Sequence, residues 1–222
     1  MRVKICGATR VEELDLLAAA SVDFVGLWHG VPGGRTELSL DQLTLLAAAA
    51  HDIQPVLVTF ESTVDELVRV VRTARIGWVQ LHGYQQPAVV RAFKENCPDI
   101  TVIKVLHIST NGECVERALV RAYQRAGVDV FLLDVLAADG RIGSTAQSID
   151  PDAAQRIADI SARPIMLAGG LSADNAARYR KLVEHPRFLG IDVDSAARDA
   201  AGRIDGRRVA EIRNQWTVVG ST

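Results

Sequence analysis

Eight short apolar segments alternate along the chain with eight amphipathic segments, and this alternation constrains the fold more than any other feature. The apolar segments are rich in β-branched residues and too short for helices; they span 3–6, 23–28, 55–60, 78–81, 101–106, 128–134, 164–168 and 187–193. Nearly continuous apolar runs of this length are typical of strands buried on both faces, as in a parallel sheet. The pattern therefore predicts eight buried parallel strands.

The intervening segments carry the apolar periodicity of helices that cover one face of a sheet. They span 11–20, 38–50, 62–74, 86–96, 111–126, 150–160, 172–183 and 206–216. Thr9 is the expected N-cap of the first helix, and Ser62 or Thr63 that of the third, which also carries acidic residues in its first turn. The sequence thus predicts a helix after every strand.

Strict strand–helix alternation indicates right-handed βαβ units and a parallel sheet. Eight units in 222 residues correspond to a single (β/α)8 barrel, for which 200 residues is about the lower limit. An open doubly wound sheet is the alternative, but its Gly-rich first turn is missing, since the first turn reads CGATR. We expect one barrel domain over residues 1–222.

Composition excludes several classes of function. The chain has 25 basic and 27 acidic residues, so no basic excess indicates a nucleic-acid or membrane partner. No apolar run reaches the roughly 18 residues of a membrane span, and no signal-type leader follows Met1. Three scattered cysteines, at 6, 97 and 114, favour neither a disulfide framework nor a metal site. We expect a cytoplasmic protein, monomer or homodimer, that acts on a small molecule.

Polar and ionisable groups gather where the predicted strands end. The residues at these ends include Lys4, Cys6, Trp28, His29, Phe60, Gln80, His82, Lys104, His107, Asp134, Asp192, Asp194 and Ser195, with Gly169 and Gly170 after the seventh strand. In a (β/α)8 barrel the carboxyl ends of all strands meet at one pole, where the active site lies. A barrel with a purely structural role has no reason to collect such groups there.

Five motifs at these strand ends resemble the phosphoribosylanthranilate isomerase family of barrel enzymes. They are K-I-C-G-A-T-R at 4–10, V-Q-L-H-G at 79–83, L-L-D at 132–134, L-A-G-G-L at 167–171 and I-D-V at 191–193. Their order and spacing are compatible with the family from Arg2 to about Ile212. The first two motifs are specific, whereas L-A-G-G-L occurs in many phosphate-binding barrels.

The resemblance implies an Amadori rearrangement in tryptophan biosynthesis, in which N-(5-phosphoribosyl)anthranilate, an aminoaldose, becomes an aminoketose. It implies Cys6 as the general base and Asp134 as the general acid. A thiol can act as base if Lys4 or the field of the site lowers its pKa, and a carboxyl group can act as acid if its surroundings hold it protonated part of the time. The chemistry needs no metal or cofactor.

The resemblance also implies a set of binding residues. Arg35 falls on the position of an arginine that contacts the anthranilate carboxylate, and a guanidinium matches a carboxylate. The other expected substrate contacts are Lys4, Gln80, His82 and Asp192, and the expected phosphate contacts are Gly169, Gly170 and Ser195. His82 can equally be a core histidine. We expect His29 and His107 to line the pocket without a chemical role, and Cys97 and Cys114 to be structural.

Two segments depart from the family pattern, and both belong to the part that holds phosphate. Where the family reads G-G-T-G-K, this chain has Ser144, Ala146 and Gln147; where it reads D-V-S-S-G-V-E, this chain has Asp194, Ala196 and Arg198. A carboxylate beside a phosphate is repulsive by about 1 kcal/mol in water and more inside a protein. Arg198 can offset this by pairing with Asp194 or by reaching the phosphate.

These departures leave three hypotheses. The first is an isomerase of phosphoribosylanthranilate or a close analogue. The second keeps the barrel and the Cys6–Asp134 pair but acts on a different, non-phosphorylated substrate in a specialised pathway. The third is a barrel that binds a metabolite without catalysis. An Asp194–Arg198 pair that blocks the anion position would count against a phosphosugar.

Overall fold

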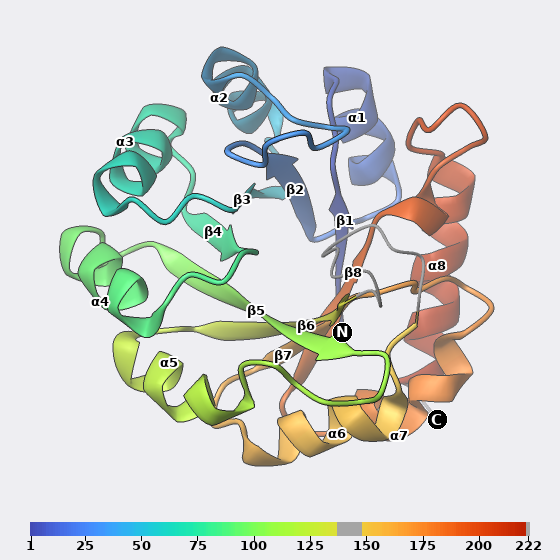
Figure 1. Cartoon of the computed structure of the whole chain (residues 1–222). Helices are drawn as coiled ribbons and strands as arrows, with labels where there is room; N and C mark the ends of the chain where they lie inside the picture. The colour runs from blue at the N-terminus through green and yellow to red at the C-terminus, as the bar shows by residue number, and fades with distance from the viewer. Residues whose placement is uncertain (137–147, 221–222) are drawn as a thin grey trace.

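The computed structural model describes residues 1–136 and 148–220, and in these ranges eight parallel strands close into a barrel in sequence order (Figure 1). The strands are β1 (Arg2–Cys6), β2 (Phe24–Trp28), β3 (Gln54–Thr59), β4 (Trp78–Leu81), β5 (Thr101–Ser109), β6 (Val130–Leu136), β7 (Ile165–Leu167) and β8 (Phe188–Val193). β8 pairs with β1, with Lys4 opposite Asp192, and this pairing closes the ring. The predicted barrel is confirmed.

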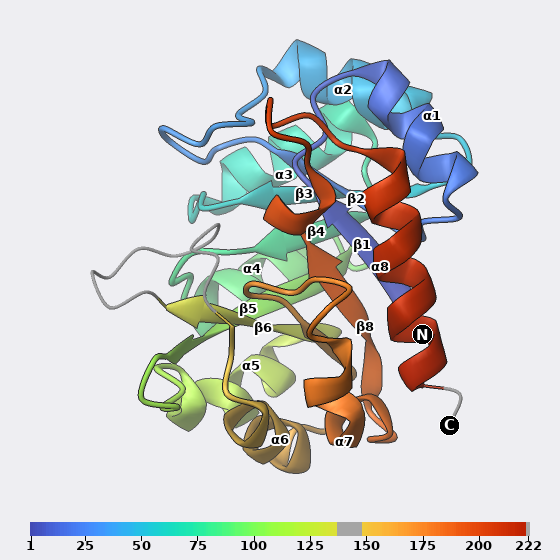
Figure 2. The same ribbon diagram turned by 90° about the vertical axis from the view of Figure 1, so that its right-hand side faces the viewer.

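Helices surround the ring of strands (Figures 1 and 2). They are α1 (Val11–Ala19), α2 (Leu40–Ala49), α3 (Val64–Ala74), α4 (Pro87–Asn96), α5 (Val120–Ala126), α6 (Pro151–Ile160), α7 (Arg180–Val183) and α8 (Gly206–Val219), with 3-10 turns η1 (Arg117–Leu119), η2 (Ala176–Tyr179) and η3 (Ser195–Ala197). Figure 1 looks onto the carboxyl ends of the strands. In Figure 2 the carboxyl ends of the strands point to the left, and the loop after β2 projects in that direction.

Side-chain alternation along each strand separates two apolar layers. On β6, Leu133 and Val135 pack outward against the helices, whereas Val130 and Leu132 belong to a cluster inside the barrel. Because the period of a strand is two, Asp134 shares the inner face with Leu132 and points into the barrel at its carboxyl end. The same alternation turns Lys4 and Cys6 inward, between the outward-facing Val3 and Ile5.

Three local predictions were wrong. Thr9 does not cap α1: the N-cap residue is Arg10, and the Thr9 N–H instead donates to the Glu13 side chain at 2.8 Å. The expected helix at 111–126 starts only at Arg117, because Gly112 takes a left-handed turn and Cys114 bridges back to Ile108. The helix expected over 172–183 likewise starts later than predicted, at Ala176.

The N-cap expected for the third helix, Ser62 or Thr63, has the predicted position but not the capping hydrogen bond. Thr63 is the N-cap residue of α3, but its side chain makes no capping hydrogen bond. Ser39, which was not predicted, forms a complete capping box with Gln42 at the start of α2. No helix in the described ranges is long and apolar enough to cross a membrane.

Candidate active site

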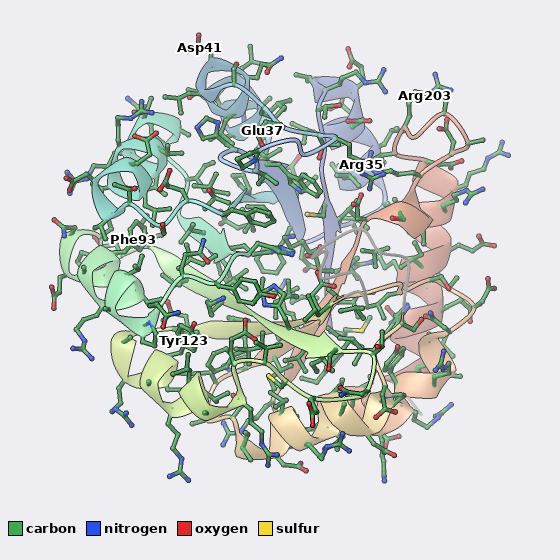
Figure 3. The ribbon with its side chains drawn as sticks, viewed as in Figure 1. Arg35, Glu37, Asp41, Phe93, Tyr123 and Arg203 are labelled. Carbon is green, nitrogen blue, oxygen red and sulfur yellow. The ribbon has the colours of Figure 1, made fainter. Side chains whose placement is uncertain are left out.

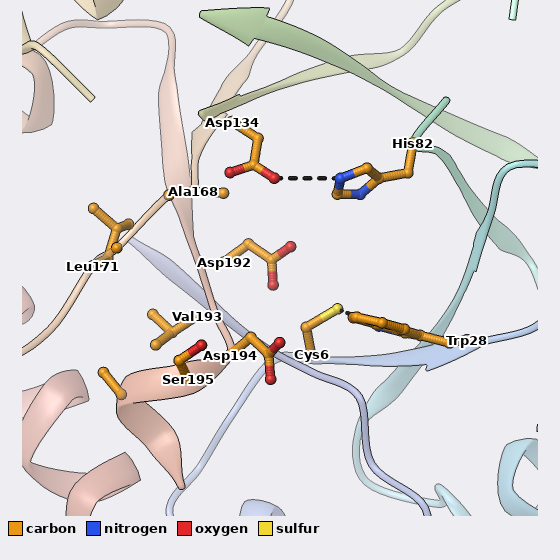
Figure 4. A pocket seen from close by; sticks show the side chains of 13 residues that line it. Cys6, Trp28, His82, Asp134, Ala168, Leu171, Asp192, Val193, Asp194 and Ser195 are labelled. Carbon is orange, nitrogen blue, oxygen red and sulfur yellow. Dashed lines mark hydrogen bonds and ion pairs between the residues drawn. The ribbon is translucent and has the colours of Figure 1, made fainter. Parts of the chain in front are cut away.

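A cavity of about 310 Å³ opens at the carboxyl ends of the strands (Figure 4). Its lining consists of Cys6, Trp28, His82, Asp134, Ala168, Gly169, Gly170, Leu171, Asp192, Val193, Asp194, Ser195 and Ala196. Seven of the ten predicted site residues are in this lining: Cys6, His82, Asp134, Gly169, Gly170, Asp192 and Ser195. The predicted acid and the predicted base therefore face one cavity, although 128 residues separate them in the chain.

The Cys6 sulfur lies at the end of β1 and is approached by two donors. The Trp28 indole Nε1–H donates to Sγ at 3.0 Å and the Lys4 ammonium donates to it at 3.3 Å. Both groups can only donate, so the sulfur is the acceptor towards each of them. Gly26 on β2 makes room for this arrangement, because a Cβ there would lie 2.6 Å from Sγ.

The groups of the protein around Cys6 do not bring the pKa of its thiol below the ordinary value, although a lowered pKa is what a thiol base needs. Burial raises the pKa of the Cys6 thiol to about 12; the Lys4 charge and the Trp28 hydrogen bond lower it, and the charges of Asp192 and Asp194 raise it further. Cys6 as a residue is only 6% exposed, so loss of hydration dominates its pKa shift. The two donors therefore lower the pKa of Cys6 by less than burial and the two nearby carboxylates raise it.

Lys4 and Asp192 form a fully buried ion pair beneath Cys6. The Lys4 ammonium lies 2.8 Å from Asp192 Oδ2, and the lysine side chain has no exposed surface. Burial opposes the charge of Lys4, but Asp192 and Cys6 outweigh it and raise the lysine pKa. Asp192 Oδ1 has no hydrogen-bond partner among the described residues, and Asp192 lines the cavity. A bound molecule can therefore donate a hydrogen bond to this oxygen.

Asp134 on β6 faces His82 at the end of β4. His82 Nε2 lies 3.3 Å from Asp134 Oδ2, and Asp134 Oδ1 accepts from the backbone N–H of Val135 at 2.8 Å. Gln80, fully buried below the pocket, orients the ring from the other side, with Nε2 3.0 Å from His82 Nδ1. Figure 4 shows Asp134 and His82 across the cavity from Cys6, with Asp192 between them.

Gly169, Gly170 and Ser195 form the opposite wall of the cavity from the loops after β7 and β8. Gly169 has a φ of +81°, and a Cβ there would lie 2.8 Å from Val135 Cγ2 and 3.2 Å from Asp134 Oδ1. Glycine is needed here because this loop approaches the predicted acid so closely. Ala196, where the family has glycine, also lines this wall.

Asp194 and Arg198 form the ion pair that the sequence analysis considered. Arg198 Nε donates to Asp194 Oδ1 at 2.8 Å, while its remaining donors bind the carbonyls of Cys6, Gly7 and Gly202. Arg198 is therefore directed away from the cavity, which remains open beside Gly169, Gly170 and Ser195. Gly7 permits this contact, because a Cβ there would lie 2.6 Å from the guanidinium.

Arg35 also binds Asp194, from the loop between β2 and α2. Its predicted role as a contact of a substrate carboxylate remains a prediction, and in this structure its guanidinium contacts the carboxylate of Asp194. Together with Lys4 and Gln80, it is one of the three predicted site residues outside the cavity lining.

The prediction that His29 and His107 line the pocket was wrong. His29 Nδ1 contacts the Leu38 carbonyl at 2.8 Å, and neither histidine is part of the cavity lining. His107 is fully buried: its Nδ1 lies 2.6 Å from Glu116 Oε1, and its Nε2 lies 3.1 Å from the His82 carbonyl oxygen. Lys104, also at a predicted strand end, faces outward over the Tyr123 ring.

Sequence reasoning missed two partners of the site. Trp28 was expected near the opening but not as a donor to Cys6, and Glu116 was not singled out at all. Glu116 lies in a segment predicted as helix, which concealed its contact with His107. The substituted positions 144, 146 and 147 lie outside the described residues. Within the described ranges no group of three or more His, Cys, Asp and Glu side chains could hold a metal ion.

A closed barrel with a thiol and a carboxyl group in one cavity at its carboxyl pole has the architecture of a (β/α)8 enzyme. The family model described as N-(5'-phosphoribosyl)anthranilate (PRA) isomerase matches residues 3–215. The N-(5'-phosphoribosyl)anthranilate isomerase of Methanocella arvoryzae is 32% identical over 98% of this chain and 98% of its own. The chain belongs to the N-(5'-phosphoribosyl)anthranilate isomerase family.

Solved structures show the same fold. Phosphoribosyl anthranilate isomerase from Thermus thermophilus superposes with a TM-score of 0.80 at 23% identity, covering 99% of this chain and 100% of that one. A second similar structure, with a TM-score of 0.76 at 23% identity and covering 98% and 99% of the two chains, is a phosphoribosyl anthranilate isomerase in complex with reduced 1-(o-carboxyphenylamino)-1-deoxyribulose 5-phosphate.

Proposed function

We propose that Cys6 and Asp134 catalyse the Amadori rearrangement of N-(5'-phosphoribosyl)anthranilate in this chain. Membership of the family makes the chain an aldose–ketose isomerase of tryptophan biosynthesis. The observation that carries the residue assignment is that a thiol from β1 and a carboxyl group from β6 line the same cavity. The substrate is a phosphosugar bound in this cavity.

Asp134 acts as the general acid. It donates a proton to the ring oxygen of the sugar, so the C1–O bond breaks and the nitrogen lone pair forms a protonated imine at C1. His82 Nε2, 3.3 Å from Asp134 Oδ2, stabilises the carboxylate that remains. The close approach of Gly169 holds Asp134 in place against the wall opposite His82.

Cys6 acts as the general base in its thiolate form. It removes the proton from C2, and the electron pair of the C–H bond neutralises the imine to give an enolamine, which tautomerises to the aminoketose. Burial keeps the pKa of the thiol high. The positive charge of the imine lowers this pKa when it is needed, because an opposite charge within a few ångströms favours the thiolate.

Asp192 serves as a substrate contact and positions Cys6 through Lys4. Its Oδ2 holds the Lys4 ammonium that donates to the sulfur, and its Oδ1 is available for a sugar hydroxyl. Ser195, Gly169 and Gly170 provide the wall along which the phosphate end of the substrate lies. Glycine at 169 and 170 lets the backbone approach phosphate oxygens closely.

Turnover by the purified protein tests the proposal. The protein is incubated with N-(5'-phosphoribosyl)anthranilate in the presence of a chelator, and formation of the aminoketose is followed. We expect conversion without added metal or cofactor. A folded protein that gives no detectable product overturns the proposed function.

One observation favours a second candidate, an isomerase of a non-phosphorylated substrate. The Asp194 carboxylate lines the cavity next to Ser195, where it would repel a phosphate. The double variant Asp194→Ser, Ala196→Gly separates the candidates. Phosphosugar binding that appears only in the variant supports the second candidate, and binding already present in the unaltered protein supports the first.

A further inference from the structure

The described lining of the cavity contains three carboxylates, from Asp134, Asp192 and Asp194, and no lysine or arginine side chain. The substrate of the proposed function carries a carboxylate and a phosphate, both anionic. An anion entering a cavity of this charge needs a cation that can move towards it, because like charges in a partly dehydrated site repel strongly. The neighbouring cations therefore decide how such a substrate is held.

Two of these cations are fixed. Lys4 has no exposed side-chain surface and is held by Asp192 and Cys6. Arg198 is 5% exposed and donates to Asp194 and to three backbone carbonyls, so four hydrogen bonds hold its guanidinium. Moving either group would leave buried acceptors without their donors, which is costly.

Arg35 differs from both. Its side chain is 43% exposed, and within residues 1–136 and 148–220 its guanidinium contacts one carboxylate, that of Asp194. It follows Gly33 and Gly34 in the loop between β2 and α2, and Figure 3 shows it beside the barrel opening. An exposed ion pair of this type contributes little to stability, so it can be exchanged for a stronger one.

Two guanidinium groups contact the two oxygens of Asp194. Oδ1 accepts from Arg198 at 2.8 Å, whereas Oδ2 faces Arg35. The buried Arg198 keeps the carboxylate at the cavity wall. Asp194 thus occupies the position of an anion between two guanidinium groups, one of which is permanent and the other exchangeable.

We propose that Asp194 is a specificity-determining residue that acts as an internal counter-anion: it holds Arg35 in the substrate-free enzyme, and an anionic group of the substrate must take Arg35 from it. The inference rests on the proposed function for the charge of the substrate. It means that Asp194 weakens the binding of anionic substrates and makes that binding depend on Arg35.

A double-mutant cycle with a non-reacting ligand tests this directly. The probe is reduced 1-(o-carboxyphenylamino)-1-deoxyribulose 5-phosphate, and its Kd is measured by calorimetry for the unaltered protein, Asp194→Asn, Arg35→Gln and the double variant. Asparagine keeps the size of Asp194 and can still accept from Arg198, so it is the matched replacement; Asp194→Ser is the second variant if Asn fails to fold.

We expect Asp194→Asn to bind the probe about tenfold more tightly, equivalent to about 1.4 kcal/mol. In the Arg35→Gln background the same substitution should give less than about a threefold gain, because no arginine remains to be released. An equal gain in both backgrounds would mean simple repulsion and would overturn the proposal, as would no gain in either.

Failure of this proposal can be told apart from failure of the proposed function. If the unaltered protein turns over N-(5'-phosphoribosyl)anthranilate but the cycle shows no coupling, the function stands and the role of Asp194 is rejected. If no variant binds the probe and the unaltered protein shows no turnover, both are rejected.

Discussion

Two parts of the cavity lining are built in different ways. The first part, called here the reacting wall, has Cys6 on one side of the cavity and His82 and Asp134 on the other, and consists of side chains on or immediately after strands, each with buried partners. The second part, called here the loop wall, has Gly169, Gly170, Asp194 and Ser195, and consists of loops after β7 and β8. The reacting wall keeps the family's motifs, whereas the loop wall departs from them at Asp194 and Ala196.

This difference indicates which positions tolerate substitution. A side chain that alternates into the barrel from a paired strand cannot move without disturbing the sheet. A loop residue can change its charge while its neighbours adjust, as Arg198 and Arg35 do around Asp194. We therefore expect substitutions on the reacting wall to affect turnover and those on the loop wall to affect binding.

The largest expected effect comes from Cys6→Ser. A serine hydroxyl is a far weaker acid than a thiol, so it cannot supply an anionic base, and kcat should fall by about 10³–10⁴-fold. Binding of the reduced analogue should change little, since the hydroxyl is smaller and neutral. Steady-state kinetics and calorimetry measure the two quantities. A loss of binding comparable to the loss of turnover would contradict the separation of the two walls.

Asp134→Asn should lower kcat by about 10²–10³-fold, because an amide cannot donate a proton to the ring oxygen. The amide keeps the shape of the side chain, so the contact with Gly169 should survive and the thermal midpoint should shift little. Circular dichroism melting provides this control. Turnover within threefold of the unaltered enzyme would remove Asp134 from the mechanism.

The alkylation rate of Cys6 in the empty enzyme should rise about 100-fold between pH 7 and pH 9. The thiolate is the reacting form, and with a pKa of about 12 its fraction increases tenfold per pH unit over this range. Rates with iodoacetamide, followed by mass spectrometry at Cys6, measure this. Asp194→Asn removes a charge that raises the pKa, so its rates should be higher. A plateau below pH 9 would show that Lys4 dominates over burial.

Trp28→Phe should reduce kcat by about three- to tenfold and slow alkylation at every pH. It removes the indole N–H that donates to the Cys6 sulfur and lowers its pKa, while it keeps an aromatic ring at the opening. The net contribution of one such hydrogen bond is about 1 kcal/mol. KM should stay within twofold. An unchanged alkylation rate would show that this bond does not act on the thiolate.

Ser195→Ala should have the smallest effect, with kcat and KM both within about twofold. In the proposed site this wall contributes backbone rather than a serine hydroxyl, and a surface-accessible polar truncation usually changes little. Steady-state kinetics on N-(5'-phosphoribosyl)anthranilate check it. A tenfold rise in KM would assign the hydroxyl itself to phosphate binding and would make the two walls more alike.

The sequence predicted the barrel and most of the cavity lining for a simple physical reason. Buried parallel strands need continuous apolar runs, and the period of two decides which residues point inward, as for Cys6 and Asp134. The prediction failed where local chemistry competed with periodicity. The segment 111–116 carries a helical pattern, but Gly112 and the Asn111 side chain form a turn. His107, predicted to line the pocket, instead forms a buried pair with Glu116.

The sequence by itself determined the order of strands and helices, because apolar periodicity is a local property, and it predicted that Cys6 and Asp134 lie at one pole of the barrel. Only the tertiary structure decided the direction in which the pKa of Cys6 is shifted. The pKa of Cys6 depends on burial and on Asp192 and Asp194, which lie almost the length of the chain away. The contact between Arg35 and Asp194 likewise joins residues 159 positions apart. Electrostatic energies depend on distances in space, which no local pattern contains.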